Sequence, residues 1–233
     1  MQHKEGVLKA PYHYSLIQKY IFDDLPLIAM NVARIGAQTP GIAYEIADGE
    51  KHFVTIGFGP MNWLLITPDV PAPGGFSVFD EIDIGDEEMP ESEGDILLYF
   101  SSGYPKLNRE LAKIVQELFG NKAELIEDVE VEGGEYSNLA EVKKQVLIED
   151  PNFLDQAQSS FLSTHRFSFM DETTTDLPQH RYNYQTDNES GNYILTFDKN
   201  PSKLEEHSES LMQPAKSRGL FFIPSLELLT SLR

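Results

Sequence analysis

Two predicted strands on either side of an amphipathic helix, within residues 95–131, constrain the fold of this chain more than any other feature. The apolar run from Asp95 to Phe100 (DILLYF) is typical of a central strand. Pro105–Phe119 follows as a predicted helix with its apolar residues on one face, and Gly120 favours its end there. Glu124–Val131 alternates apolar and charged residues, which predicts another strand. The helix is therefore expected to pack its apolar face onto a sheet.

The residues before this segment extend the alternation of strands and helices. Tyr12–Ile21 and His52–Phe58 are rich in aromatic and β-branched residues and are predicted strands. Between them, an Asp cap followed by Pro26 predicts a helix over about residues 24–36, and a short helix is expected near residues 61–66. This order of elements is typical of an antiparallel sheet with helices on one face, the ferredoxin-like pattern.

The second half of the chain repeats this order in a shorter form. Its predicted strands are Arg166–Met170, Tyr182–Gln185, Tyr193–Phe197 and Gly219–Ile223. Asn200-Pro201-Ser202 predicts the start of a helix that runs to about residue 212, and further helices are expected at 139–146 and 226–232. Because no stretch of sequence is itself repeated, the duplication is inferred from the order of the elements.

The sequence therefore predicts an α+β protein made of two ferredoxin-like halves, each an antiparallel sheet with helices packed on one face, in a dimeric α+β barrel-like arrangement. The predicted boundaries are 1–134 for the N-terminal half, 135–160 for a connecting segment and 161–233 for a shortened C-terminal half. Sheet faces that need covering favour a homo-oligomer in such an architecture.

Composition and charge exclude several classes of site and partner. The chain has no cysteine, which excludes disulfides, thiolate metal sites and a cysteine nucleophile. A net charge of -20 at pH 7 repels phosphate backbones and anionic lipid, so we expect neither nucleic acid nor a membrane as partner. No apolar run approaches about 20 residues, and residues 1–11 lack the apolar stretch of a signal peptide. We therefore expect a cytoplasmic protein.

The acidic run at residues 80–95 follows a stretch rich in proline and glycine. We interpret it as a solvated loop, because charge runs of this kind usually face water. A cation site is the alternative, although the spacing of the carboxylates does not match an EF-hand loop. Two His-Arg pairs, at 165–166 and 180–181, are expected in loops or on strand surfaces.

Short segments spread along most of the chain match a known order of motifs. They are VTIGFGP at 54–60, EGDILLYF at 93–100, FMDET at 169–173, GNYIL at 191–195 and GLFFI at 219–223. In these segments the chain resembles the DyP-type (dye-decolourising) haem peroxidases. The resemblance implies two ferredoxin-like halves, with haem in the second, and haem-dependent reduction of peroxide coupled to oxidation of an organic donor.

The resemblance also implies roles for three residues. Members of this family bind haem iron through an axial histidine and use a distal aspartate and a distal arginine on peroxide. Asp171 occupies the position of the distal aspartate. His207 is the histidine between the second-half helix and the last strand, so it is the candidate axial ligand of the haem iron. Arg218 is the arginine of the same interval and the candidate distal arginine.

The sequence also departs from the pattern of these peroxidases. Two glycines of the signature are replaced by Ser168 and Glu172, and the segment before the last strand is short. The alternative function is therefore a non-catalytic DyP-like scaffold that has lost the haem-binding segment and acts as a small-ligand binding or interaction protein. In that case His207 is a solvated residue on a helix, Asp171 a cap or turn residue and Arg218 a charge at a strand edge. The sequence is compatible with both functions.

Overall fold

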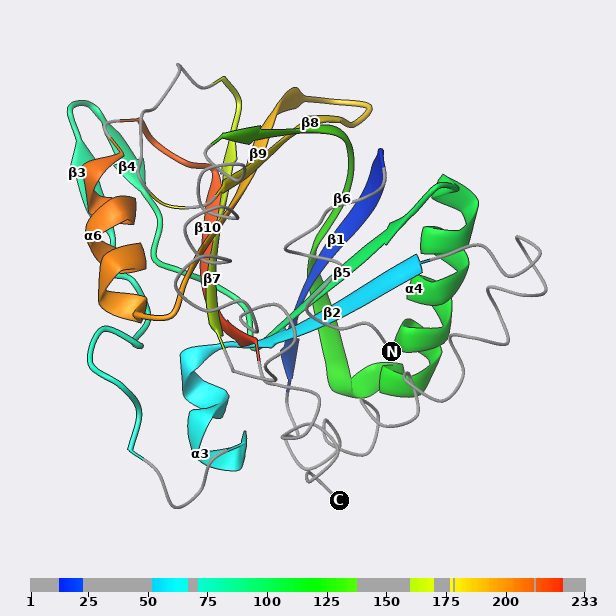
Figure 1. Cartoon of the computed structure of the whole chain (residues 1–233), viewed down its shortest axis with the longest axis horizontal. Helices are drawn as coiled ribbons and strands as arrows, with labels where there is room; N and C mark the ends of the chain where they lie inside the picture. The colour runs from blue at the N-terminus through cyan, green and yellow to red at the C-terminus, as the bar shows by residue number, and fades with distance from the viewer. Residues whose placement is uncertain are drawn as a thin grey trace, which may run out of the picture.

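The computed structural model describes residues 13–22, 52–66, 71–137, 160–169, 177, 179–211 and 213–223. Within them, eight antiparallel strands of the one chain close into a barrel (Figure 1). The barrel strands are β1 (Tyr14–Phe22), β2 (His52–Phe58), β5 (Ile96–Ser102), β6 (Ala123–Ser137), β7 (Ser160–Phe167), β8 (Gln179–Gln185), β9 (Ser190–Asp198) and β10 (Ser217–Ile223). The other elements are the hairpin β3 (Ile82–Ile84) and β4 (Glu87–Met89), the helices α3 (Trp63–Ile66), α4 (Pro105–Phe119) and α6 (Pro201–Ser210), and the 3-10 turns η1 (Pro60–Asn62) and η2 (Gly120–Lys122).

The strand order of the first half is repeated in the second. Around the barrel the order is β1-β5-β2-β10-β7-β9-β8-β6. In each half the fourth barrel strand pairs with the first, the first with the third and the third with the second. The halves meet where β2 pairs with β10 and where β6 pairs with β8. Closure of the barrel therefore needs both halves and leaves none of its strands as a free edge.

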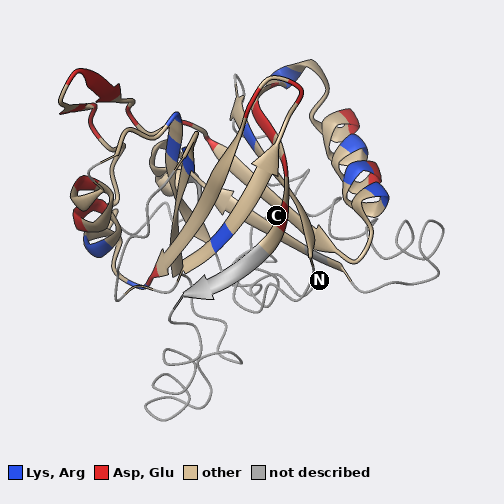
Figure 2. Ribbon diagram, turned by 90° about the horizontal axis from the view of Figure 1, so that it is seen from above, with Lys and Arg blue, Asp and Glu red and all other residues tan. Residues whose placement is uncertain are grey.

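Alternation along the strands separates an inner core from an outer one. Leu16 and Leu98 belong to the outer cluster, together with Leu107 of α4. Their neighbours Ile17 and Leu97 belong to the inner cluster, which fills the barrel. Helix α4 covers the outer face of the first half, and α6 lies on the opposite side of the barrel, against β7 and β9 (Figures 1 and 2).

A tyrosine pair links the two halves inside the barrel. The hydroxyl of Tyr99 on β5 lies 2.7 Å from the hydroxyl of Tyr182 on β8, and both side chains are buried. Ser15 donates a second hydrogen bond to Tyr99. Each buried hydroxyl thus has a partner, so the inner core can contain polar atoms without a large desolvation cost.

Most predicted elements are present, and two have the predicted bounds. The strand at His52–Phe58 and the helix at Pro105–Phe119 are confirmed residue for residue. The strand predicted at 166–170 is wrong in position, since β7 begins at Ser160 and ends at Phe167. Its residues 161–165 are all buried, so no apolar-polar alternation marked its start. The predicted helices at 24–36, 139–146 and 226–232 lie outside the described residues.

The acidic run is not a simple loop. It contains the β3–β4 hairpin, in which Gly85 has a φ of 66° at the turn. Figure 2 shows Asp and Glu gathered on this hairpin, and its Met89 is fully buried against Phe167 and Leu211. The acidic residues of the hairpin are exposed as expected, but the interpretation as a loop is wrong for this part of the run, because it forms a hairpin that Met89 anchors to the second half.

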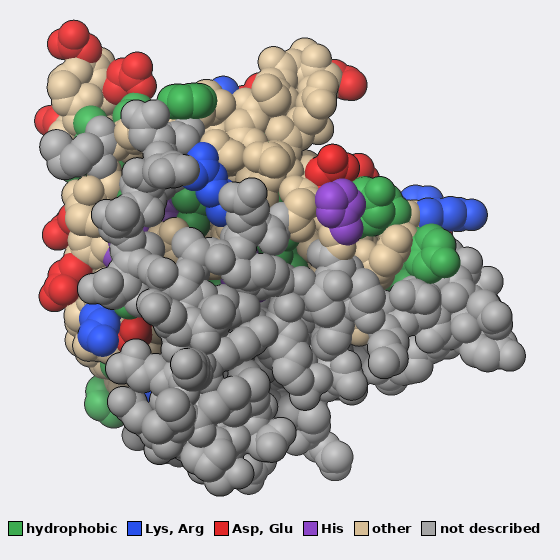
Figure 3. Space-filling view, turned by 45° about the horizontal axis from the view of Figure 1, so that its top comes forward, with side chains coloured by type: hydrophobic (Ala, Val, Ile, Leu, Met, Phe, Trp, Pro, Cys, Tyr) green, Lys and Arg blue, Asp and Glu red, His purple; other side chains and the backbone are tan. Residues whose placement is uncertain are grey.

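The charges of the described surface are distributed rather than concentrated in basic areas. On the face shown in Figure 3, the described Lys and Arg side chains lie apart from one another, and Asp and Glu occupy several edges. Among the helices of the described residues, none is both long and apolar enough to cross a membrane.

Candidate functional site

A layer of buried polar side chains lies between helix α6 and the sheet of the second half. We call it the polar layer. Its members are each at most 9% exposed and come from five elements; they are Ser163, His165, Gln179, Thr196, His207, Ser208 and Arg218. Strand pairing places Ser163 beside Thr196 and Arg218 beside His165, so residues distant in sequence meet on one face.

Hydrogen bonds connect the polar layer to α6. His165 Nε2 lies 2.9 Å from Ser208 Oγ, and Arg218 donates from Nη1 to the same hydroxyl at 3.1 Å. Gln179 Nε2 lies 2.8 Å from His207 Nε2. The two imidazole rings are 6.5 Å apart and nearly perpendicular. The structure therefore brings two of the predicted site residues, His207 and Arg218, into one layer on either side of Ser208.

Arg218 is held by backbone carbonyls. Its side chain is 1% exposed, although the alternative prediction placed it at a strand edge. Its guanidinium donates to the carbonyl oxygens of Asp80 and Pro90 and lies 5.4 Å from the centre of the Phe79 ring. The prediction of a strand-edge charge is wrong, because β10 lies between β2 and β7 and the segment around the acidic hairpin covers its outer face.

Both histidines of the polar layer favour the neutral form. Burial lowers the pKa of His165 well below its usual value, and the nearby His207 and Arg218 lower it further. Burial also lowers the pKa of His207. The alternative prediction of His207 as a solvated helix residue is wrong, since the side chain is 9% exposed. Its charged neighbours in sequence point elsewhere on the helix, which sequence alone did not reveal.

Three atoms of the polar layer have no hydrogen-bond partner among the described residues. They are His165 Nδ1, Ser163 Oγ and Thr196 Oγ1. Unpaired buried polar atoms cost about 1–3 kcal/mol each, so such a group needs a reason. All three lie on the face of the sheet that α6 covers.

The residues of the polar layer do not fit haem at His207. The DyP resemblance implies an iron ligand, an arginine and Asp171 facing one cavity. Here the Nε2 of His207 is against the amide of Gln179, and each of the three nitrogens of the Arg218 guanidinium donates to Pro90, Ser208 or Asp80. Helix α6 packs directly on β7 and β9. Asp171 lies outside the described residues.

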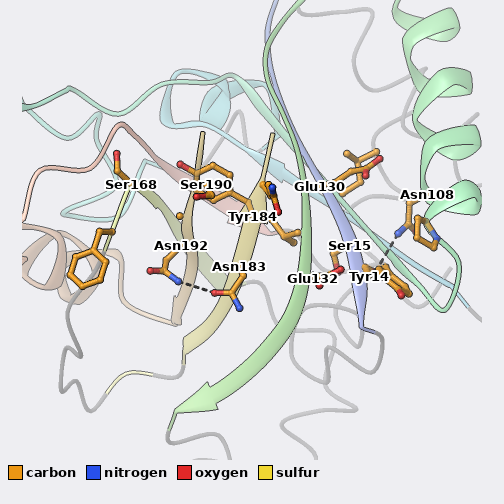
Figure 4. Close-up of a pocket in the computed structure, with 16 residues that line it drawn as sticks. Tyr14, Ser15, Asn108, Glu130, Glu132, Ser168, Asn183, Tyr184, Ser190 and Asn192 are labelled. Atoms are coloured by element: carbon orange, nitrogen blue, oxygen red, sulfur yellow. Dashed lines mark hydrogen bonds between the residues drawn. The ribbon is translucent and has the colours of Figure 1, made fainter. Parts of the chain in front are cut away.

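A cleft of about 670 Å³ lies elsewhere, where β6 leaves β1 and pairs with β8 (Figure 4). We call it the β6–β8 cleft. Its volume is in the range of small-molecule sites. It is lined by Tyr14, Ser15, Leu16, Pro105, Asn108, Glu130, Val131, Glu132, Ser168, Phe169, Asn183, Tyr184, Gln185, Ser190, Gly191 and Asn192. These residues include no histidine, lysine or arginine.

Several polar groups of the β6–β8 cleft are already paired. Arg109 binds Glu130 and Asp128, and Asn192 donates to Asn183 at 3.1 Å. In contrast, Glu132 forms no ion pair with any described residue, and the hydroxyl of Tyr184 has no hydrogen-bond partner among them. Ser168 and Phe169, the described residues at the start of the signature segment, lie on the wall of this cleft.

A second buried network was not predicted. Inside the barrel, Lys19 lies 2.6 Å from Glu127, which also binds Arg166 and Ser217. Burial alone would raise the pKa of Glu127, but the positive charges of Lys19 and Arg166 hold it below its usual value. Tyr193 donates to the same carboxylate. The signal in the sequence was a lysine within strand β1, next to Tyr20 and Ile21.

No sequence signal pointed to the β6–β8 cleft. Its walls come from segments that are more than 100 residues apart, such as Tyr14 and Asn192, and strand pairing alone brings them together. The histidines of the two His-Arg pairs were expected in loops or on strand surfaces. His165 and His180 are both 0% exposed, so that expectation is wrong for them.

No protein-family model matches the sequence, and no curated protein matches it. Solved structures do match. DyPB from Rhodococcus jostii aligns with a TM-score of 0.71 at 14% identity, over 94% of this chain and 95% of that chain. A putative DyP-type peroxidase from Shewanella oneidensis aligns with a TM-score of 0.70 at 14% identity, over 94% and 95%. The encapsulated DyP-type peroxidase from Mycobacterium smegmatis aligns with a TM-score of 0.69 at 15% identity, over 94% of each chain.

Some of the similar structures are variants of the Rhodococcus protein in complex with heme. The resemblance seen in the short sequence motifs is thus present in the whole fold: the chain has the DyP fold, an α+β structure with a closed antiparallel barrel. At 14–15% identity, this likeness concerns the fold.

Proposed function

We propose that this chain, which has the DyP fold, binds a small ligand in the β6–β8 cleft and does not hold haem through His207. The observation that carries the proposal is the hydrogen bonding of the polar layer, in which Gln179 contacts His207 Nε2 and backbone carbonyls engage Arg218. A peroxidase needs an iron ligand and a positive hydrogen-bond donor free to face one ligand. Here both side chains are committed to the protein itself.

The architecture supports the view that a peroxidase-like scaffold was kept without the haem-binding segment. The repeated strand order agrees with two ferredoxin-like halves, which enclose the barrel between them. Residues 211–216 alone separate α6 from β10, so little chain is present there to surround a cofactor. A cytoplasmic location and a homo-oligomer belong to the same proposal, and light scattering of the purified protein tests the second.

The test is an absorbance titration with haemin. We expect no Soret band that depends on His207, so wild type and His207→Ala should give the same spectrum. The control is His13→Ala, which removes an exposed histidine at the start of the barrel and should also leave the spectrum unchanged. Stoichiometric haem with a Soret band that weakens only in His207→Ala would overturn the proposal.

A haem peroxidase is the second candidate, favoured by the likeness to DypB variants in complex with heme. It predicts peroxide-dependent oxidation of a dye by haem-loaded protein and loss of that activity in Asp171→Asn. Under our proposal, protein purified after expression with added haem precursor has no such activity above free haemin.

A further inference from the structure

The described residues that line the β6–β8 cleft offer hydrogen-bond acceptors and negative charge and include no cationic side chain, although Arg109 and Arg181 contact the lining residues Glu130 and Asn192. Two carboxylates on β6, Glu130 and Glu132, line it, and the remaining polar groups are amides and hydroxyls. Figure 4 shows Tyr14, Asn108 and Glu132 on one side of the cleft and Asn183 and Asn192 on the other. A ligand that donates hydrogen bonds and carries positive charge complements such walls.

The charge of one carboxylate is available to a ligand. Arg109 neutralises Glu130 and also binds Asp128, with its Nη1 2.7 Å from Asp128 Oδ2. Glu132, two residues further along β6, lies on the same face of the strand and has no ion pair among the described residues. Within the cleft, Glu132 is therefore the carboxylate that can pair with a cation.

A buried acceptor next to it also lacks a donor. Asn108 is 2% exposed and lies in the first turns of α4. Its Nδ2 donates to the backbone oxygen of Tyr14 at 3.3 Å, which fixes the orientation of the amide. Its Oδ1 then faces away from that carbonyl and has no partner among the described residues. Asn108 thus adds a buried polar group to the lining of the cleft, while its unpaired oxygen is itself enclosed.

The cleft also has an apolar surface for the body of a ligand. Phe169 lies on its wall and is 71% exposed, and Tyr14 and Pro105 line it as well. An exposed phenylalanine at the rim of a cleft is a typical contact for an apolar or aromatic group. Aromatic rings next to a carboxylate also favour an ammonium ion.

We infer that the β6–β8 cleft binds a small organic ammonium ion, a primary amine with an apolar or aromatic body, with Glu132 accepting from the ammonium group. The inference rests on the proposed function, because it names the ligand class of the same cleft. No reaction is implied: the ligand donates hydrogen bonds and its charge is paired.

Calorimetric titration of the full chain with 2-phenylethylamine and its neutral analogue 2-phenylethanol tests the inference. The amine is expected to bind at one site and at least about tenfold more tightly than the alcohol, since a charge-assisted hydrogen bond contributes about 1.5–3 kcal/mol. Glu132→Gln is expected to remove this preference. The matched control Glu87→Gln, which removes one exposed carboxylate from the distant β3–β4 hairpin, keeps it.

Several outcomes would overturn the inference. They are equal affinity for amine and alcohol, absence of binding by both, and an equal loss in Glu132→Gln and Glu87→Gln, which would indicate attraction by the overall negative charge. Circular dichroism confirms that each variant is folded. The haemin titration is an independent experiment. If haem binding depended on His207 and the amine affinity were unchanged, the absence of haem at His207 would be wrong and the amine site would stand. If neither haem nor the amine bound, the amine site alone would be wrong.

Discussion

The side chains of His165 and Ser208 join the barrel to helix α6: His165 Nε2 lies 2.9 Å from Ser208 Oγ, and neither residue is exposed. Arg218 donates to the same hydroxyl, so one serine connects β7, β10 and α6. This contact therefore holds α6 against the sheet of the second half.

Ser208→Ala is expected to destabilise the protein by about 1–3 kcal/mol, because it leaves His165 Nε2 without its buried partner and removes one of the hydrogen bonds of Arg218. Urea unfolding followed by circular dichroism measures the change. Ser210→Ala is the matched control on the same helix; the residue is exposed and its hydroxyl bonds only to the nearby backbone oxygen of His207, so we expect a change within about 0.5 kcal/mol. Equal effects of the two substitutions would show that the contact contributes nothing.

Stability is expected to fall as the pH falls below about 6.5, the usual pKa of histidine. The pKa values of His165 and His207 are lower in the folded protein than in the unfolded chain, so the unfolded state binds protons first. Each imidazole then lowers the free energy of unfolding by at most about 1.4 kcal/mol per pH unit. The stability that the neutral imidazoles provide above pH 6.5 is therefore lost as the pH falls.

Urea unfolding at pH 7.5 and pH 5.5 measures this dependence. Glu127 stays ionised over this pH range, because its pKa is lowered, and so it does not contribute to the change. The dependence should be smaller in His165→Gln than in the wild type and unchanged in His13→Gln, which alters an exposed histidine. A wild-type profile retained in His165→Gln would contradict the buried neutral imidazole.

Glu127→Gln is expected to destabilise the protein by about 3–5 kcal/mol, since it leaves Lys19 buried without its counter-ion. The double variant Lys19→Met with Glu127→Leu removes both charges and should recover part of the loss. Equilibrium unfolding in urea at pH 7.5 compares the two. If the double variant were no more stable than the single one, packing rather than the ion pair would account for the effect.

Gly191→Ala is expected to cost about 1–3 kcal/mol, because a Cβ at this position would overlap the backbone oxygen of Phe167 in the neighbouring strand. The control is Gly74→Ala, where no atom lies within 4 Å of the added Cβ, and its effect should be within about 0.5 kcal/mol. Thermal unfolding compares the two variants. A lower Tm for Gly191→Ala than for Gly74→Ala would show that the motif GNYIL needs glycine for strand packing.

Several elements could be predicted from sequence because their signals are local. The helix Pro105–Phe119 has apolar residues on one face, a proline at its start and Gly120 at its end, with a φ of 59°. The strand His52–Phe58 is bounded by turn residues. The element order then predicted the α+β class, and the short motifs led to the DyP fold that the solved structures share.

The candidate site was harder to predict because it depends on which strands are neighbours. His207 lies among charged residues in sequence, yet it faces Gln179 of β8. Arg218 begins a strand, yet its charge is enclosed by the carbonyls of Asp80 and Pro90, more than 120 residues earlier. Neither environment can be inferred from the residues nearby in the chain.

The sequence by itself determined most of the described barrel strands, helices α4 and α6, their order and the acidic, cysteine-free character of this protein, since periodicity and composition are properties of neighbouring residues. Only the tertiary structure decided that His207 and Arg218 are enclosed in a packed layer and that a cleft opens instead between β6 and β8. Burial and cavities arise from contacts between segments far apart in the chain, and closure of the barrel is what brings those segments together.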